Sequence, residues 1–197
     1  MEITAKMVKE LRETTGAGMM DCKKALSECD GEMEKAVAYL RKKGIASASK
    51  KEGRATSQGI VGSYIHMGGK VGVLVEVACE TDFVARTDNF QDFVHNVAML
   101  IAAASPLAVT REEVDSSLIE KEKEIYRAQM EEQGKPAEMI EKIVGGKVDK
   151  YYSEIVLMEQ KYVKDPDVTI EDYLKSTIGE LGENMQIKRF TRFQIGS

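Results

Sequence analysis

The stretch GIVGSYIHMGGKVGVLVEVAC, residues 59–79, decides the fold of this 197-residue chain. Its second half, residues 70–79, places valine at every other position, which is typical of a strand with one buried face, and its first half is rich in β-prone residues. The pair Gly68-Gly69 between the halves predicts a two-residue hairpin turn. Because an isolated hairpin is unstable in water, a third strand or a layer of helices must cover it.

The tail of the chain supplies the third strand. Residues 186–195, QIKRFTRFQI, are β-prone, and their Lys and Arg side chains suit an edge position that must not aggregate. Between the hairpin and this strand, a helix is expected to begin at Thr87 or Asp88 and to stop before Pro106. Its buried stripe would consist of Phe90, Val94, Val97, Ile101 and Ala104.

A charged helical hairpin is expected next. The first helix would span about Arg111 to Glu132, and the second would begin near Pro136 and be interrupted by Gly145-Gly146. A last short helix opens at Thr169, with Val168 and Tyr173 as a hydrophobic staple. The fold class is therefore α+β, in which helices pack on one side of a small three-stranded antiparallel sheet and a helical arm extends from it.

The first 44 residues predict three short helices. Thr4 can cap the first, the second runs from about Met20 to Ser27, and the third runs from Glu32 to Lys43 with Gly44 as its C′ residue. This length and pattern are similar to the ubiquitin-associated type of domain, which is a binding module. The alternative is that the three helices only cap the larger domain.

Residues 45–58 have the small, polar and basic composition of a linker. The sequence thus divides into a three-helix domain at 1–44, a linker at 45–58 and an α+β core domain at 59–197. Lys50, Lys51 and Arg54 would either contact an acidic partner or remain solvated. Charge changes at the same place, since residues 1–54 hold twelve basic and nine acidic side chains and the remainder holds sixteen and twenty-four.

Composition excludes several classes of function. The net charge of −5 argues against binding nucleic acid through a basic surface, and no apolar stretch is long enough to span a membrane. The first residues lack the apolar region of a signal peptide. Three cysteines at irregular spacing suit a reducing compartment, so a cytoplasmic protein is expected.

No set of residues predicts catalysis, a metal site or a cofactor. His66 and His95 lie in strand and helix patterns, away from any nucleophile signal, and Cys22 and Cys29 do not have the spacing of zinc ligands. Gly69-Lys70 and Gly146-Lys147 lack the other residues of a phosphate-binding loop. The chain is therefore expected to act by binding, without covalent chemistry.

One aromatic residue is a candidate for such binding. Phe83 follows the strand end Glu76-Val77-Ala78-Cys79 and precedes a helix, where a loop is expected. An aromatic side chain on a short anchored loop can serve as an interface anchor. The alternative is that Phe83 folds back and covers the end of the sheet.

Three motifs resemble signatures of the translation elongation factor Ts family. They are LRETTGAGMMDCKKAL at 11–26, EVACETDFVAR at 76–86 and GENMQIKRFTRF at 182–193, so the resemblance covers essentially the whole chain. The length is similar to that of the short, bacterial-type members. The chain departs from the family at Ala78, where the usual residue is Asn, and a turn or capping hydrogen bond is expected to be missing there.

The resemblance implies a guanine-nucleotide exchange factor for the GTPase elongation factor Tu. The inserted segment would be Thr81, Asp82, Phe83 and Val84, in which Phe83 acts as a wedge and Asp82 steadies the loop. The N-terminal domain would grip the same partner through Arg12, Met19, Met20 and Lys23, and two adjacent methionines cannot both face so small a core. Short members pair as homodimers, so a homodimer is expected.

Two other functions compete with nucleotide exchange. The chain could be a non-catalytic adaptor that uses its ubiquitin-associated-like domain and helical arm to bind other proteins. A weaker alternative is an RNA-associated translation protein that uses Lys50, Lys51 and Arg54, whose binding would depend steeply on salt.

Overall fold

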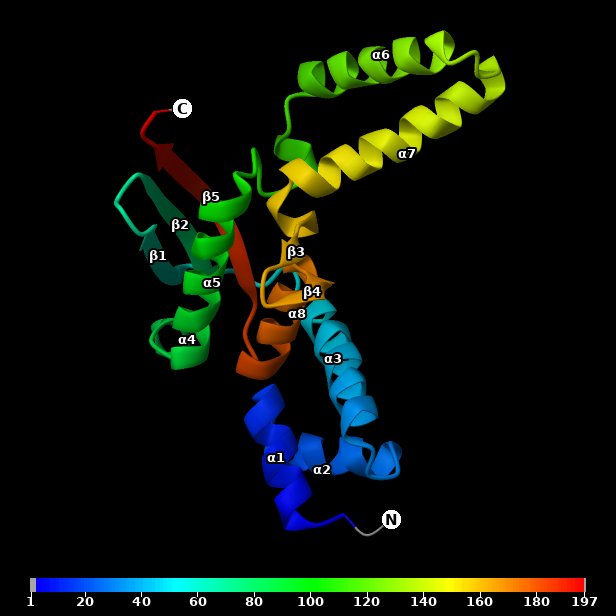
Figure 1. Cartoon of the computed structure of the whole chain (residues 1–197). Coiled ribbons are helices and arrows are strands. Elements are labelled where there is room, and N and C mark those ends of the chain that lie inside the picture. Colours follow the sequence, from blue (N-terminus) through cyan, green and yellow to red (C-terminus); the bar gives the residue numbers. More distant parts are fainter. Residues whose placement is uncertain (1–2, 197) are drawn as a thin grey trace. The chain divides into compact units, whose positions relative to one another are not determined.

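The computed structural model describes residues 3–196, and these divide into two compact units. The first unit takes in the chain up to Ile60, then Val77–Phe93 and Asp172–Gln186, and the second takes in Val61–Glu76, Val94–Glu171 and the chain from Ile187 onward. The α+β class expected from the sequence is confirmed: helices dominate, and three strands form a small antiparallel sheet (Figure 1).

Three helices open the first unit: α1 (Ala5–Thr15), α2 (Met19–Glu28) and α3 (Met33–Ser49). Thr4 caps α1 as expected, because its Oγ1 accepts a hydrogen bond from the backbone N–H of Met7 at 3.3 Å. The helices share a core made of Val8, Leu11, Cys22, Ala25, Leu26, Ala36 and Leu40. These are the positions at which the sequence shows helical periodicity.

The third helix does not end where the sequence predicts. Gly44 was expected to terminate it, but α3 continues to Ser49, so the first part of the expected linker is helical. The reason is a contact with α8 (Ile170–Leu181): a Cβ placed on Gly179 would lie 2.7 Å from the Cα of Gly44. Two glycines thus let the helix backbones meet within the first unit, and this packing outweighs the low helix propensity of Gly44.

The sheet has the order β1-β2-β5, formed by β1 (Gln58–Ile65), β2 (Val71–Cys79) and β5 (Met185–Gln194). The tail is therefore an edge strand, as expected, and the alternating valines Val73, Val75 and Val77 are buried. The hairpin turn is longer than the two residues predicted. The backbone N–H of His66 donates a hydrogen bond to the carbonyl of Val71 at 2.9 Å, which closes a loop over residues 67–70. Within this loop, Gly68 and Gly69 both adopt positive φ.

Helix α5 (Asp88–Ala104) carries the predicted apolar stripe. Phe90, Val94, Val97 and Ile101 are buried, whereas Ala104, at the end of the helix, is exposed. Within the second unit, a Cβ placed on Gly62 would lie 2.2 Å from Val94 Cγ1, so α5 packs directly on β1. Helix α5 therefore packs against the valine-bearing face of the sheet.

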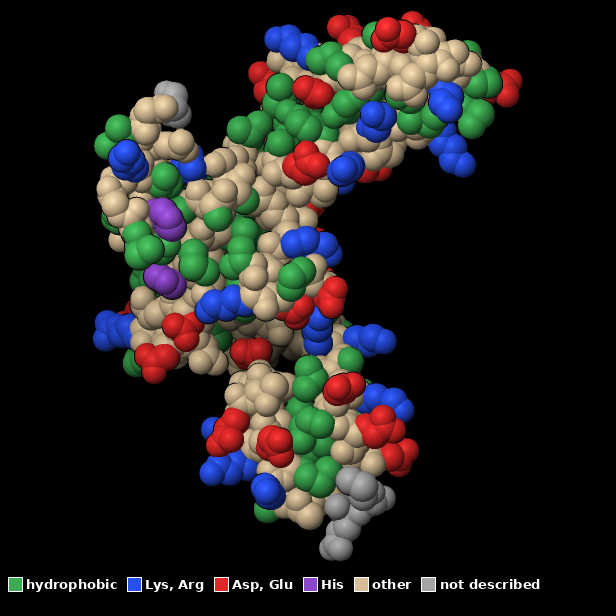
Figure 2. Space-filling view, in the orientation of Figure 1, with side chains coloured by type: hydrophobic (Ala, Val, Ile, Leu, Met, Phe, Trp, Pro, Cys, Tyr) green, Lys and Arg blue, Asp and Glu red, His purple; other side chains and the backbone are tan. Residues whose placement is uncertain are grey.

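The expected helical hairpin is present as α6 (Ser116–Glu132) and α7 (Ala137–Ile155), which we call the arm (Figure 1). It begins later than predicted, because Arg111–Glu113 form a separate 3₁₀ turn, and Asp115 caps α6. Gly145-Gly146 do not interrupt α7, contrary to the prediction. Figure 2 shows basic and acidic side chains interspersed over the arm, and Arg127 pairs with Glu141 at 2.8 Å.

Arg111 fixes the base of the arm. Its guanidinium donates to Asp149 at 2.9 Å and to Glu159 at 2.7 Å, and it lies 4.4 Å from the centre of the Tyr152 ring. The 3₁₀ turn Leu157–Glu159 follows α7 directly. These contacts join both ends of the hairpin within the second unit.

A small two-stranded sheet was not predicted. Its strands are β3 (Lys161–Tyr162) and β4 (Asp165–Thr169), which pair antiparallel next to the start of α8. Their short length and Pro166 hide the strand pattern in the sequence. Among residues 3–196, no helix is both long and apolar enough to cross a membrane.

Candidate functional site

Phe83 lies on a one-turn helix, α4 (Asp82–Ala85), where the sequence predicted a loop. Its side chain is 79 % exposed, whereas Ala85 on the same turn is buried. The alternative in which Phe83 folds back over the sheet end is therefore wrong. An exposed large aromatic side chain on a turn anchored by a buried residue is well placed for contact with another molecule.

The sequence explains this short helix locally. Thr81 has extended backbone angles and caps α4, since its Oγ1 accepts a hydrogen bond from Val84 N at 3.4 Å. Asp82 lies in the first turn, where a negative charge is favoured by the helix dipole, and it pairs with Arg86 at 2.8 Å. An exposed ion pair of this kind contributes little to stability, about 0–1 kcal/mol, so Asp82 alone cannot hold the turn.

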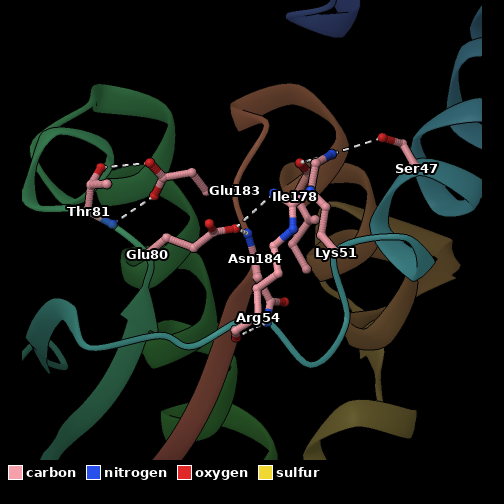
Figure 3. Close-up of polar contacts among 8 residues, drawn as sticks. All are labelled: Ser47, Lys51, Arg54, Glu80, Thr81, Ile178, Glu183 and Asn184. Carbon is pink, nitrogen blue, oxygen red and sulfur yellow. Dashed lines mark hydrogen bonds and ion pairs between the residues drawn. The ribbon is translucent and has the colours of Figure 1, made fainter.

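Four residues hold the turn in place, and we call them the reciprocal clamp: Glu80, Thr81, Glu183 and Asn184. The Glu183 carboxylate accepts the Thr81 backbone N–H at 2.9 Å and the Thr81 hydroxyl at 2.6 Å. In return, the Glu80 carboxylate accepts the Asn184 backbone N–H at 2.6 Å. Figure 3 shows the two carboxylates crossing between the end of β2 and the start of β5. Hydrogen bonds to carboxylates are roughly twice as strong as neutral ones, so the clamp fixes the base of α4.

The strand leading into the clamp is tightly packed. Ala78 and Cys79 are both buried, and Cys79 Sγ donates to the Thr81 carbonyl at 3.1 Å. Burial raises the pKa of the Cys79 thiol, which keeps it protonated and able to donate. A Cβ placed on Gly59 would lie 2.7 Å from the Cα of Ala78. Position 78 thus lies inside a strand and is itself in neither a turn nor a helix cap.

The N-terminal candidates lie on α1 and α2. Met19 and Met20 occupy the first turn of α2 and are both exposed, as the sequence suggested. Lys23, one turn further along α2, and Arg12, in the last turn of α1, are also exposed. The residue before this turn, Gly18, offers no side-chain cap.

The basic residues after α3 are partly engaged within the chain. Lys51 Nζ donates to Ser47 Oγ at 2.8 Å and to the Ile178 carbonyl at 3.5 Å, as Figure 3 shows. Arg54 pairs with Glu80 at 3.5 Å, and its carbonyl accepts from Asn184 Nδ2 at 2.9 Å. Lys50 is exposed. Two of the three cations considered for an acidic or RNA partner thus contribute to the fold.

The two histidines considered for catalysis both lie against the ring of Tyr64. His66 accepts or donates a hydrogen bond with Tyr64 at 3.1 Å, and the Tyr64 ring packs edge-on against His95. Cys22, Cys29 and Cys79 are free thiols. Within residues 3–196, no three His, Cys, Asp or Glu side chains gather as metal ligands would.

Sequence reasoning missed Glu183 and Asn184 as functional candidates. Both belong to the motif GENMQIKRFTRF, whose residue pattern predicts only a strand. Their partners lie about a hundred residues earlier, so no local pattern links them. The fold and site together define an α+β protein that has a small three-helix bundle and presents an exposed aromatic residue on a clamped helical turn.

Comparison with known proteins identifies the family. The family model described as Elongation factor TS matches residues 5–197. The elongation factor Ts of Geobacter sulfurreducens is 64 % identical over the full chain, which spans 91 % of that protein. That of Desulfosudis oleivorans is 59 % identical, and the match covers 98 % of each of the two proteins. That of Fervidobacterium nodosum is 58 % identical, and the match covers both proteins in full. The chain belongs to the elongation factor Ts family of translation elongation factors, which confirms the resemblance found in its motifs.

Proposed function

We propose that this protein is a guanine-nucleotide exchange factor for elongation factor Tu, acting in the cytoplasm by binding alone. The observation that carries the proposal is Phe83, which is exposed on a turn that the reciprocal clamp makes rigid. A rigid, protruding aromatic side chain can enter a partner without first losing conformational entropy. Neither a cofactor nor covalent chemistry is required for this action.

The mechanism follows from how a GTPase holds its nucleotide. A phosphate loop and a Mg²⁺ ion together neutralise the charge of the GDP phosphates. Phe83 inserts between helices of the nucleotide-binding domain of elongation factor Tu, with Thr81, Asp82 and Val84 around it. The helices shift, the Mg²⁺ site loses its geometry and GDP leaves. Because coupling is reciprocal, a factor that binds the nucleotide-free form more tightly must weaken GDP binding.

The three-helix domain provides a second contact with the same partner. Met19 and Met20 supply adaptable apolar surface, and Arg12 and Lys23 supply charge. We assign this role to residues 1–44, the connection to residues 45–58 and the exchange and assembly functions to residues 59–197. The helical continuation of α3 to Ser49, packed on α8, supports a connection that is shorter and stiffer than a free linker.

The test is GDP release from elongation factor Tu loaded with a fluorescent GDP analogue. Addition of the full-length chain should accelerate release, and the acceleration should saturate with its concentration. A non-catalytic adaptor would leave the release rate unchanged even if it bound. An RNA-associated protein would instead bind RNA with a steep salt dependence.

A homodimer completes the proposal, and the outer face of the sheet supports it. Val61, Ile65, Leu74 and Phe193 are exposed there, opposite the buried valines of β2. Ile65 lies over Gly72, since a Cβ on Gly72 would be 3.0 Å from Ile65 Cδ1. A cluster of exposed apolar side chains on one sheet face is typical of a protein interface.

Light scattering at micromolar concentration tests the dimer. The wild-type chain should have twice its monomer mass of 21.9 kDa, and Phe193→Asp should shift it to the monomer. A wild-type monomer with full exchange activity would contradict the dimer and leave the exchange function intact.

A further inference from the structure

Thr81 has a hydroxyl group that must perform two tasks at once. Its Oγ1 accepts a hydrogen bond from Val84 N, which caps α4, and its proton is donated to Glu183 Oε1. A serine or threonine hydroxyl can rotate freely unless a partner fixes its proton. The Glu183 carboxylate accepts a hydrogen bond from that hydroxyl and so fixes its proton, which leaves the oxygen lone pairs directed toward the helix.

The length of α4 makes this cap decisive. A helix of four residues forms few internal hydrogen bonds, and the first turn of any helix is entropically unfavourable. The direction of Phe83 therefore depends on contacts from outside the turn. Glu183 supplies two of them, to the N–H and the hydroxyl of the capping residue.

The position of Glu183 suits it to hold another residue. It precedes Asn184 and Met185, which are both buried where β5 begins, so its backbone is anchored in the fold. Glu80 returns the contact through Asn184 N and is itself paired with Arg54. Figure 3 shows Glu80 just after the end of β2, and Glu183 and Asn184 just before the start of β5.

We propose that Glu183 is a positioning residue for nucleotide exchange, which fixes the orientation of Phe83 by binding Thr81 through both its N–H and its hydroxyl. This inference rests on the proposed function. The competing explanation is that Glu183 only joins β5 to β2, in which case its loss would destabilise the whole fold and have no specific effect on Phe83.

The first variant is Glu183→Gln, which keeps size and shape but replaces one acceptor oxygen with a donor NH₂ group. That group cannot accept the hydrogen bond of the Thr81 hydroxyl, so the interaction that fixes the hydroxyl proton is lost. At a sub-saturating concentration of the variant, we expect the stimulated rate of GDP release to fall about tenfold. This is the effect of losing one hydrogen bond to a charged group. The Val84 amide should also exchange its hydrogen about tenfold faster, while amides in α5 stay protected.

The matched control is Glu120→Gln, which removes a carboxylate that pairs with Lys123 at 2.7 Å on the arm. This variant should exchange GDP like the wild type. Melting temperatures of both variants are also measured. A large loss of global stability in Glu183→Gln, with faster hydrogen exchange at amides of α5 and β2 as well as at Val84, would support the structural explanation. That result would overturn the inference.

A double-mutant cycle with Phe83→Ala decides between the explanations. If Glu183 acts by positioning Phe83, Glu183→Gln has no further effect on exchange once Phe83 is removed. If it acts on the fold, the same loss appears in both backgrounds. If Phe83→Ala stimulates GDP release at the wild-type rate, the wedge in the proposed function is refuted. If Phe83→Ala is slow but Glu183→Gln releases GDP at the wild-type rate, only the present inference is overturned.

Discussion

Phe83 stands on the first turn of α4 with 79 % of its side chain exposed, and Met20 stands on the first turn of α2 with 76 % exposed. The turn under Phe83 is capped by Thr81, whose N–H and hydroxyl are both bound by a carboxylate. The turn under Met20 begins at Gly18 and has no side-chain cap. The two side chains are thus similarly exposed, but a clamped cap lies under Phe83 and no side-chain cap lies under Met20.

The difference teaches how one chain can divide the work of binding. A rigid aromatic side chain loses little conformational entropy when it inserts into a partner, which suits a wedge. Flexible methionines adapt to an irregular surface and are more tolerant of change, which suits a grip. Loss of Phe83 should therefore affect exchange strongly, and loss of the methionines should affect mainly affinity.

The largest expected effect is that of Phe83→Ala. Truncation of a central aromatic anchor costs roughly 2–4 kcal/mol, so stimulated GDP release should fall about 30- to 1000-fold. The melting temperature should change little, because the side chain is exposed. Leu107→Ala, which removes another exposed apolar side chain, is the control and should exchange normally. A Phe83→Ala protein that is destabilised by about 3–5 kcal/mol but exchanges normally would contradict the wedge.

The next effect concerns how the N-terminal helices are attached. Gly179→Ala places a methyl group 2.7 Å from the Cα of Gly44, and such overpacking costs about 1–3 kcal/mol. Gly145→Ala in α7 meets nothing within 4 Å and should stabilise by about 0.5–1 kcal/mol. Urea unfolding measures both free energies. Equal shifts for the two variants would show that α3 does not pack on α8.

A smaller effect is expected for Met19→Ala combined with Met20→Ala. The fold should be unchanged, and affinity for elongation factor Tu should fall about 3- to 10-fold, because peripheral contacts contribute less than a central anchor. Calorimetric titration measures the affinity, with the exposed Ser27→Ala on the same helix as the control. Undiminished affinity would remove the methionines from the binding surface and leave only Phe83 in the comparison.

The last effect is a pH dependence at Glu180. This residue of α8 lies close to Gly16, since a Cβ placed there would be 3.1 Å from Glu180 Oε2. Desolvation raises the pKa of Glu180 from 4.5 to about 7, although a hydrogen bond with Ser176 opposes the shift. The folded protein then binds more protons than the unfolded chain in this window, so the free energy of unfolding falls as pH rises from 4.5 to about 7.

Glu180→Gln removes this titration. The variant should show a shallower loss of stability across the same window and should be more stable than the wild type above it. Urea unfolding of both proteins at a series of pH values checks the sign. Parallel profiles would show that the carboxylate stays solvated beside the N-terminal helices.

The sequence alone was sufficient for most of the fold. Alternating valines predicted β2, helical periodicity predicted the N-terminal core and α5, and Thr4 marked the first helix start. These succeed because the deciding interactions are local or periodic. The end of α3 could not be predicted, because Gly44 packs against Gly179, which lies far along the chain.

The candidate site was predictable only in part. Phe83 was identified as an unusual aromatic residue, and the family motif favoured its exposure, but the residues themselves left its direction undecided. Helix α4 is too short for any periodicity to appear. The carboxylate that holds it, Glu183, contacts Thr81 across a separation of 102 residues, which no local signal encodes.

That separation has a consequence for synthesis of the chain. Residues 80–81 leave the ribosome well before residues 183–184, and at about 5–20 residues per second the delay is on the order of 5–20 s. Contacts of such high sequence separation are also among the last to form in folding, because closure of a long loop must come first. A nascent chain therefore carries Phe83 on an unclamped segment until residues 183–184 are made.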